Sequence, residues 1–308
     1  MSKLFIIGNG FDLAHGLPTA YSCFHRYLQE TYPEADEENA DVPWATMGHH
    51  GEELYDENKV VGYLMCLLSR TAKENWSDFE NALGYLDFSY DLYDPSDFTD
   101  RDGEPNYFHT FYNNEDTSSQ LSRCVPKILD LFSEWVETID IAKASPKAEF
   151  QRLIDTSDDL FLIFNYTQTL EKLYGVQNVC HIHGTLGETL LVGHGAEPRP
   201  DENHWSHYIG SEDNMELIQN VLRKDTAGAL EKHKPFFQKL SSGLSEVYSY
   251  GFSFGEVDEV YIKEICQAMP TKSMVWYLHN HAPGDHQRFK AILRRCGFKG
   301  KIDTFYCR

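Results

Sequence analysis

The sequence lacks any apolar run near the roughly 20 residues that a membrane-spanning helix requires. It also lacks an N-terminal signal pattern, because its first apolar stretch, residues 4–7, is short and leads directly into Gly8. We therefore expect a cytoplasmic protein. The 308 residues suffice for one large domain or two small ones, and a hydrophobic content of 41% provides ample core material.

Basic residues are scarce. The sequence has 27 Lys and Arg residues and 48 Asp and Glu residues, which gives a formal net charge of -21. An acidic surface repels phosphate backbones and anionic lipids, so we expect no membrane binding and no broad binding of nucleic acid. One local basic segment, Lys290–Lys301, contains Arg294, Arg295 and Lys299. A solvated helix face explains this segment better than a binding patch does.

Cysteine is present without a pattern. The seven cysteines are scattered and odd in number, and none belongs to a C-x-x-C pair, which favours reduced structural thiols over disulfides or a zinc cluster. The motifs G-x-S-x-G, H-E-x-x-H and G-x-x-x-x-G-K-[ST] are absent as well. These absences count against a serine hydrolase, a zinc protease of that class and a P-loop ATPase.

The most informative segment that is present opens the chain. Residues 4–7 run unbroken into Gly8-Asn9-Gly10. A continuous apolar run suits a strand buried on both faces of a parallel sheet, and the glycines let the backbone approach a ligand. A strand, a glycine turn and a helix form a cradle for a phosphate or nucleotide. An ordinary tight turn fits equally well, because Leu13 stands where a dinucleotide fingerprint has its third glycine.

Strand-like and helix-like segments alternate along the chain. Further buried strands are predicted at residues 160–164, 179–184, 190–195, 247–253 and 274–279. Helical spacing occurs at residues 21–32, 59–86, 121–141, 257–268 and 286–296. This alternation predicts an α/β fold, a Rossmann-like parallel sheet with helices on both faces.

Two acidic, turn-rich segments, residues 33–58 and 88–116, interrupt this pattern. We expect a single α/β domain over residues 1–308, in which residues 33–150 form a mostly helical insertion.

Chemically useful residues follow the predicted strands. Gly8, Asn165, His183, Gly251 and His279 each stand at a strand end. In an open parallel sheet the ligand lies beyond the carboxyl ends of the strands. The sequence therefore predicts one composite site at that edge.

The side chains at these ends have more than one interpretation. The amide of Asn165 can hold a ribose hydroxyl or a water, or it can cap the next helix. His181 and His183 alternate along a strand, so we expect both on one face. Either could act as a general acid or base, bind a metal, or pack in the core. The sequence offers no carboxylate or cysteine motif to complete a metal site, so we predict none.

Two other segments supply candidates. Glu80 lies one helical turn after Trp76, where its carboxylate could line a pocket or stand at the edge of the core. Gly251 to Asp258 is a second glycine-containing strand-to-helix turn, which could approach a phosphate or ribose. Asp258 also suits the helix dipole without any ligand.

Together, these motifs resemble the bacteriophage abortive infection AbiH family. The resembling segments, in order, are residues 5–12, 16–18, 76–80, 164–167, 181–184 and 250–253. The same motifs, in the same order, are more distantly similar to those of the sirtuin-like NAD hydrolase domains of anti-phage defence proteins.

The resemblance implies an anti-phage protein with a sirtuin-like core that hydrolyses NAD at the nicotinamide–ribose bond. Asn165 would orient ribose or water, His183 would be the catalytic base, and Glu80, His181 and Thr167 are further pocket candidates. The residues predicted to border the nucleotide are Gly8, Asn9, Gly10, Phe11, Asp12, Gly251, Ser253 and Asp258.

The sequence departs from the sirtuin pattern in two places. Thr167 replaces the aspartate of Asn-x-Asp, and the zinc-binding cysteine module of sirtuin deacylases is absent. Lysine deacylation is therefore not expected, and a non-catalytic nucleotide sensor is an alternative. A metal-dependent nuclease is a second alternative.

We expect no required cofactor, because NAD would be the substrate or ligand. As a partner we expect a second copy of the chain or another defence protein.

Overall fold

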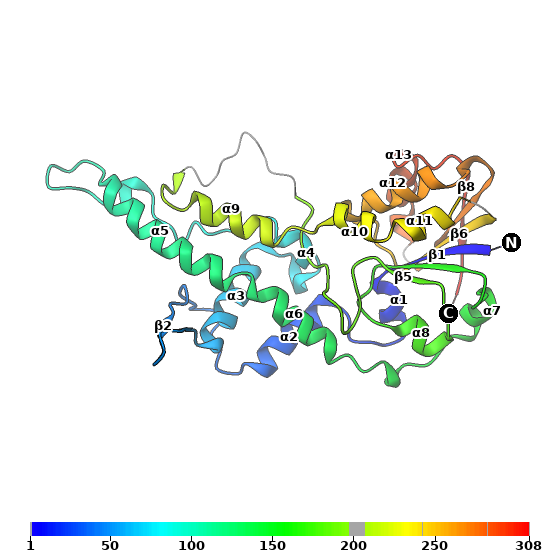
Figure 1. The fold of residues 1–308 in the computed structure, drawn as a ribbon, viewed down its shortest axis with the longest axis horizontal. Helices are drawn as coiled ribbons and strands as arrows, with labels where there is room; N and C mark the ends of the chain where they lie inside the picture. The colour runs from blue at the N-terminus through cyan, green and yellow to red at the C-terminus, as the bar shows by residue number, and fades with distance from the viewer. Residues whose placement is uncertain (1, 197–206, 242, 282, 308) are drawn as a thin grey trace. The chain divides into compact units, whose positions relative to one another are not determined.

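Figure 1 shows the protein as a computed structural model, which describes residues 2–196, 207–241, 243–281 and 283–307. The chain forms two compact units, each built from separate stretches of sequence. Unit 1 comprises residues 1–20, 136–191 and 225–308, and unit 2 comprises residues 21–135 and 192–224. Unit 2 thus contains most of the predicted insertion at residues 33–150, together with residues 21–32 and 192–224.

Unit 1 is built on a six-stranded sheet in which every neighbouring pair is parallel, which confirms the predicted α/β, Rossmann-like fold. In sheet order the strands are β5 (Val179–His181), β4 (Leu160–Ile163), β1 (Ser2–Ile7), β6 (Leu244–Tyr250), β7 (Val275–His279) and β8 (Lys301–Phe305). Numbered along the chain, this is the order 3-2-1-4-5-6 of dinucleotide-binding folds, whose strand order reverses beside the first strand.

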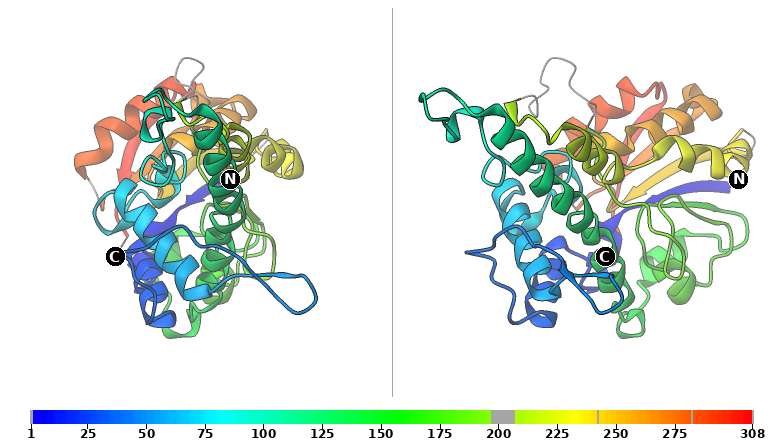
Figure 2. Two further views of the ribbon diagram at one scale, coloured as in Figure 1. Left: turned by 90° about the vertical axis from the view of Figure 1, so that its left-hand side faces the viewer. Right: turned by 60° about the vertical axis from the view of Figure 1, so that its left-hand side comes forward.

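Both faces of this sheet are buried, as the unbroken apolar runs require. Leu4 and Ile6 belong to one core cluster, and Phe5 and Ile7 belong to the other. The first cluster includes residues of α10 (Thr226–Lys232), α11 (Lys234–Lys239), α12 (Glu259–Ala268) and α13 (His286–Arg295). The second includes residues of α1 (Asn9–Ala14), α7 (Ala148–Leu153) and α8 (Thr169–Tyr174). The two groups of helices lie on opposite sides of the sheet (Figure 1 and Figure 2), as predicted.

Unit 2 is helical, with an aromatic core. Phe24 contacts the rings of Trp76, Phe79, Phe132 and Trp135 at centroid distances of 5.3 to 5.9 Å. Helix α9 packs along α5, and a short hairpin joins β2 to β3. The elements are α2 (Tyr21–Thr31), β2 (Thr46–Met47), β3 (Glu53–Leu54), α3 (Glu57–Thr71), α4 (Phe79–Ala82), α5 (Tyr107–Cys124), α6 (Lys127–Glu137) and α9 (Glu212–Val221).

Two long helices predicted from spacing are each broken. The one at residues 59–86 ends with α3 at Thr71, where Ala72 becomes extended with a ψ of 150°. It does not resume directly, because Asn75 and Trp76 take left-handed φ values of 57° and 53°, which a right-handed helix cannot contain. The one at residues 121–141 is two helices, α5 and α6, separated at Pro126, whose ring disfavours a continuous helix. Helix α5 also begins at Tyr107, inside the segment predicted as turn-rich.

One predicted strand is absent, and one observed strand was not predicted. Residues 190–195 form no strand, and His194 makes only an isolated bridge to Arg223. Gly193 lies so close to the Leu222 carbonyl that a Cβ would be 2.3 Å from its oxygen. Strand β8 was missed because it is an edge strand with exposed and half-buried residues, such as Lys301 and Asp303, and has no continuous apolar run. Among the described residues, no helix has both the length and the apolar character needed to cross a membrane.

The turns after β1 and β6 touch where the strand order reverses. The Gly8 N–H donates to the Tyr250 carbonyl at 3.0 Å, and the Gly10 N–H donates to the Gly251 carbonyl at 2.9 Å. A Cβ on Gly8 would lie 2.6 Å from the Gly251 oxygen. On Gly251, which has a φ of 65°, a Cβ would lie 2.2 Å from the Phe11 nitrogen. The contact between two backbones therefore requires these glycines, whether or not a ligand binds.

This contact predicts a large cost for Gly251→Ala. The left-handed φ alone costs about 1–2 kcal/mol, and the clash with Phe11 adds about 1–3 kcal/mol. Gly187→Ala is the matched control, because Gly187 has a φ of 84° and open space around it. Urea denaturation should show the larger loss for Gly251→Ala. Equal losses in the free energy of unfolding would mean that the contact between the two turns does not contribute to stability.

Candidate functional site

Asp12 and Thr167 meet at the carboxyl edge of β1 and β4. Asp12 lies in α1 and is 1% exposed, and its Oδ2 accepts a hydrogen bond of 2.5 Å from the Thr167 hydroxyl. The Thr167 hydroxyl also lies 3.0 Å from Thr169 Oγ1. Burial raises the pKa of Asp12, and the hydrogen bond from Thr167 acts in the opposite direction. A carboxylate thus stands beside Thr167, although position 167 itself is not aspartate.

Asn165 is buried near the same group and does not cap the following helix. It is 5% exposed, and α8 begins at Thr169 with Gln168 at its N-cap position. Among the residues that the structure describes, neither Asn165 Oδ1 nor Asp12 Oδ1 has a hydrogen-bond partner. Two buried acceptors without donors are costly, and such groups call for a ligand or a water.

His181 and His183 do not share one face, so that prediction was wrong. Strand β5 ends at His181, and the chain turns before His183. His181 places its Nε2 2.6 Å from Glu171 Oε1 and its Nδ1 3.4 Å from the Asn165 carbonyl oxygen. His183 has a different set of neighbours.

His183 is enclosed by aromatic rings and faces a carboxylate. It is 2% exposed, and the ring centroids of Phe164, Tyr166 and Tyr261 lie 5.3, 6.3 and 5.6 Å from its own. Its Nε2 is 3.4 Å from Asp258 Oδ1, a distance that suits an ion pair when the imidazole is protonated, although the angles do not make a hydrogen bond. A histidine that can take up a proton beside a carboxylate has the chemistry of a general base.

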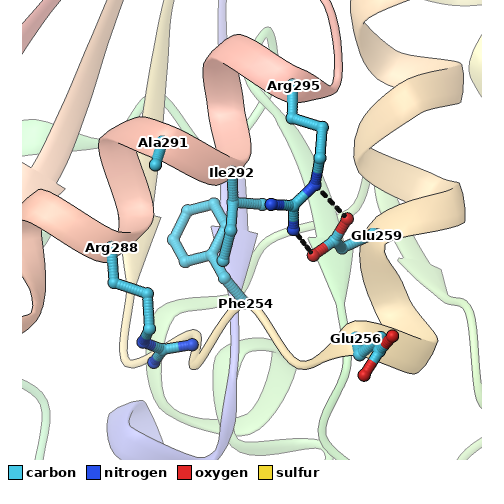
Figure 3. Close-up of a pocket in the computed structure, with 7 residues that line it drawn as sticks. All are labelled: Phe254, Glu256, Glu259, Arg288, Ala291, Ile292 and Arg295. Carbon is cyan, nitrogen blue, oxygen red and sulfur yellow. Dashed lines mark hydrogen bonds and ion pairs between the residues drawn. The ribbon is translucent and has the colours of Figure 1, made fainter.

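The turn after β6 leads to Asp258 and borders an open pocket. Asp258 lies in the short helix η5 (Glu256–Asp258), while Ser253 is exposed and its carbonyl accepts from Arg288 Nη2 at 3.0 Å. Figure 3 shows the pocket, of about 500 Å³, between this turn and α13. Its lining residues are Phe254, Glu256, Glu259, Arg288, Ala291, Ile292 and Arg295.

The arginines of the basic segment 290–301 are engaged within the protein. Arg295 pairs with Glu259 through both carboxylate oxygens (Figure 3). Arg294 Nη1 donates to the carbonyls of Phe298 and Gly300, each at 2.9 Å. These two arginines therefore stabilise local structure at the end of α13.

Three predicted residues of unit 1 have structural partners. Phe11 is fully buried and packs on Phe150 and Tyr250, each at 5.1 Å. Asn9 Nδ2 donates to the Thr19 carbonyl at 2.7 Å. His279 stacks on Tyr250 at 4.0 Å. Burial lowers the pKa of His279.

Glu80 belongs to unit 2 and is part of a buried ion pair. Its carboxylate lies 2.5 Å from the Nζ of Lys224, whose side chain is almost completely buried, and it accepts from the Tyr21 hydroxyl at 3.2 Å. Among the described residues, no three His, Cys, Asp or Glu side chains are grouped so as to hold a metal ion.

Sequence reasoning missed a chain of hydrogen bonds that fixes α1. His15 Nδ1 donates to the Phe11 carbonyl at 2.7 Å, which leaves Nε2 to accept from the Tyr174 hydroxyl at 2.7 Å. The Tyr174 oxygen accepts from the Lys147 N–H at 2.7 Å. Burial lowers the pKa of His15 and raises that of Tyr174 to about 12. The spacing of His15, four residues after Phe11 on a helix, was the available signal.

The fold and these side chains define a Rossmann-like α/β protein with buried polar groups at the carboxyl edge of its sheet. A comparison with protein families matches Bacteriophage abortive infection AbiH over residues 4–280. The chain belongs to this family, as its motifs predicted, and thus to the proteins of anti-phage abortive infection. Comparisons with curated proteins and with solved structures found no match.

The buried Asp12 predicts an unusual gain of stability on substitution. Because its pKa is raised on folding, the native state binds its proton more tightly than the unfolded state, and ionisation at neutral pH costs folding free energy. Asp12→Asn should therefore be more stable than wild type at pH 7 in urea denaturation. The gain should shrink as the pH falls and should vanish below the unfolded-state value of 3.8, where Asp12 is protonated in both states.

Asp303→Asn is the control of opposite sign. A hydrogen bond from Lys301 lowers the pKa of Asp303, so its ionised form stabilises the native state above the unfolded pKa. This variant should lose stability at pH 7. A loss in Asp12→Asn as well would show that ionised Asp12 is stabilised in the fold.

Proposed function

We propose that the carboxyl edge of β1 and β4 in unit 1 binds the ribose of NAD, and that the protein hydrolyses the nicotinamide–ribose bond during abortive infection. The observation that carries this proposal is the pair of buried acceptors without donors, Asp12 Oδ1 and Asn165 Oδ1. Ribose hydroxyls are donors and would satisfy such acceptors. The strand order supports a dinucleotide at this edge.

In the proposed reaction, water attacks the anomeric carbon of the ribose as the bond to the nicotinamide nitrogen breaks. The products are nicotinamide, ADP-ribose and a proton. Asp12 would hold the ribose, Asn165 would orient the water, and His183 would accept the proton. Asp258, 3.4 Å from His183 Nε2, would stabilise the resulting imidazolium.

The glycine turn has a smaller part in this scheme than its sequence suggested. The N–H groups of Gly8 and Gly10 already donate to the turn after β6. They shape the edge of the sheet, and the proposal assigns binding to the side chains instead.

The hydrolase proposal predicts that the purified protein releases nicotinamide from NAD. Chromatography measures the nicotinamide, both without and with an extract of infected cells, which would supply a trigger if one is needed. His183→Ala should lose at least about 100-fold in rate, the usual worth of a positioned acid–base group. Asn165→Ala should lose about as much, because the attacking water would no longer be oriented. His50→Ala, an exposed histidine of unit 2, should retain full activity. If the wild type leaves NAD intact under both conditions, the hydrolase proposal fails.

A non-catalytic nucleotide sensor is the second candidate, and Thr167 favours it. Its hydroxyl donates to Asp12, so position 167 supplies neither a carboxylate nor a free base. A sensor should show a rise in Tm with NAD that Asn165→Ala abolishes, with no nicotinamide released. Turnover by the wild type would refute the sensor, and no thermal shift and no turnover would refute both candidates.

A further inference from the structure

Helix α5 of unit 2 begins with four exposed aromatic residues. Tyr107, Phe108, Phe111 and Tyr112 are 58%, 80%, 41% and 60% exposed. Their spacing places them side by side over the first turns, while Thr110, on the packed face, is fully buried. Exposed apolar groups gathered in this way are uncommon on a protein surface and mark sites of interaction.

The segment of chain that contains these rings is acidic. Residues 94–116 contain seven acidic residues, a single arginine and no lysine. Five of the acidic residues lie in the segment before α5, and Glu115 and Asp116 continue the exposed face of the helix. Among the residues that the structure describes, none of the seven forms an ion pair.

The acidic segment is held against the start of the helix. A bridge between Thr99 and Pro105 closes a narrow loop, and the Asn106 N–H donates to the Phe98 carbonyl at 2.8 Å. The Phe98 ring lies 4.2 Å from the ring of His109, on the first turn of α5. Figure 1 shows this loop extending from the N-terminal end of α5. The acidic loop therefore lies against the first turn of α5, which carries the aromatic rings, and we call residues 94–116 the α5 tip.

We propose that the α5 tip docks a basic segment of another protein, rich in arginine. Guanidinium groups stack on aromatic faces and also pair with carboxylates, so arginine matches both features of this surface. Charge complementarity selects such a partner and excludes anionic ones. A second copy of the chain, with a net charge of -21, would meet electrostatic repulsion here.

A defined peptide tests the chemistry. The probe is a fluorescein-labelled synthetic peptide of alternating arginine and leucine, added to the full chain and followed by anisotropy. Phe108→Ser combined with Tyr112→Ser should weaken binding about tenfold at unchanged charge. The matched control, Trp44→Ser with Met47→Ser, removes two residues that are 56% and 70% exposed elsewhere in unit 2 and should bind like wild type.

Two further arms complete the test. Asp100→Asn with Asp102→Asn should also weaken binding, and the same peptide with glutamate in place of arginine should not bind. Circular dichroism of each variant checks folding. Equal affinity of the aromatic and control variants would overturn the proposal, as would concentration-dependent self-association of the wild type that the aromatic variant loses, since the occupant would then be a second copy.

Discussion

Two backbone turns that touch through glycine hold the carboxyl edge of the sheet together. Two N–H groups of the turn after β1 donate to carbonyls at the end of β6 and in the turn after it, at the point where the strand order reverses. No side chain fits there, because a Cβ on Gly251 would overlap the Phe11 nitrogen. The start of α1 follows directly from this contact, so the position of Asp12 depends on it. The sequence Gly8-Asn9-Gly10 suggests a phosphate-binding loop, but in the structure its glycines are required for the packing of the two turns.

The polar groups at this edge are held at a cost in stability. Asp12 is buried with a raised pKa, and Asn165 Oδ1 and Asp12 Oδ1 have no donor among the described residues. Folded proteins satisfy nearly all such groups unless a site needs them. In contrast, both ring nitrogens of His15 have hydrogen-bond partners, the Phe11 carbonyl and the Tyr174 hydroxyl. These bonds hold α1, and with it the buried carboxylate of Asp12, in place. A rigid support beneath unsatisfied groups is the arrangement expected of a binding site.

The sequence predicted the parallel sheet and the family well, because apolar runs buried on two faces are strong local signals. It failed where tertiary contacts override local pattern. The helix expected at residues 59–86 ends at Thr71, and the left-handed conformation of Trp76 shortly after it is one that propensity disfavours. Strand β8 escaped notice because an edge strand needs no apolar run. Alternation suggested a shared face for His181 and His183, yet the strand ends between them.

By itself, the sequence determined which residues stand at the ends of strands, since periodicity and glycine placement are local properties. Only the tertiary structure decided which of these residues meet. Asp12 and Thr167 are 155 positions apart and share a hydrogen bond because β1 and β4 are neighbours in the sheet. His183 faces Asp258 because the segments after β5 and β6 both lie at the carboxyl edge of the sheet. Strand order brings distant side chains together, and no spacing along a single chain encodes that order directly.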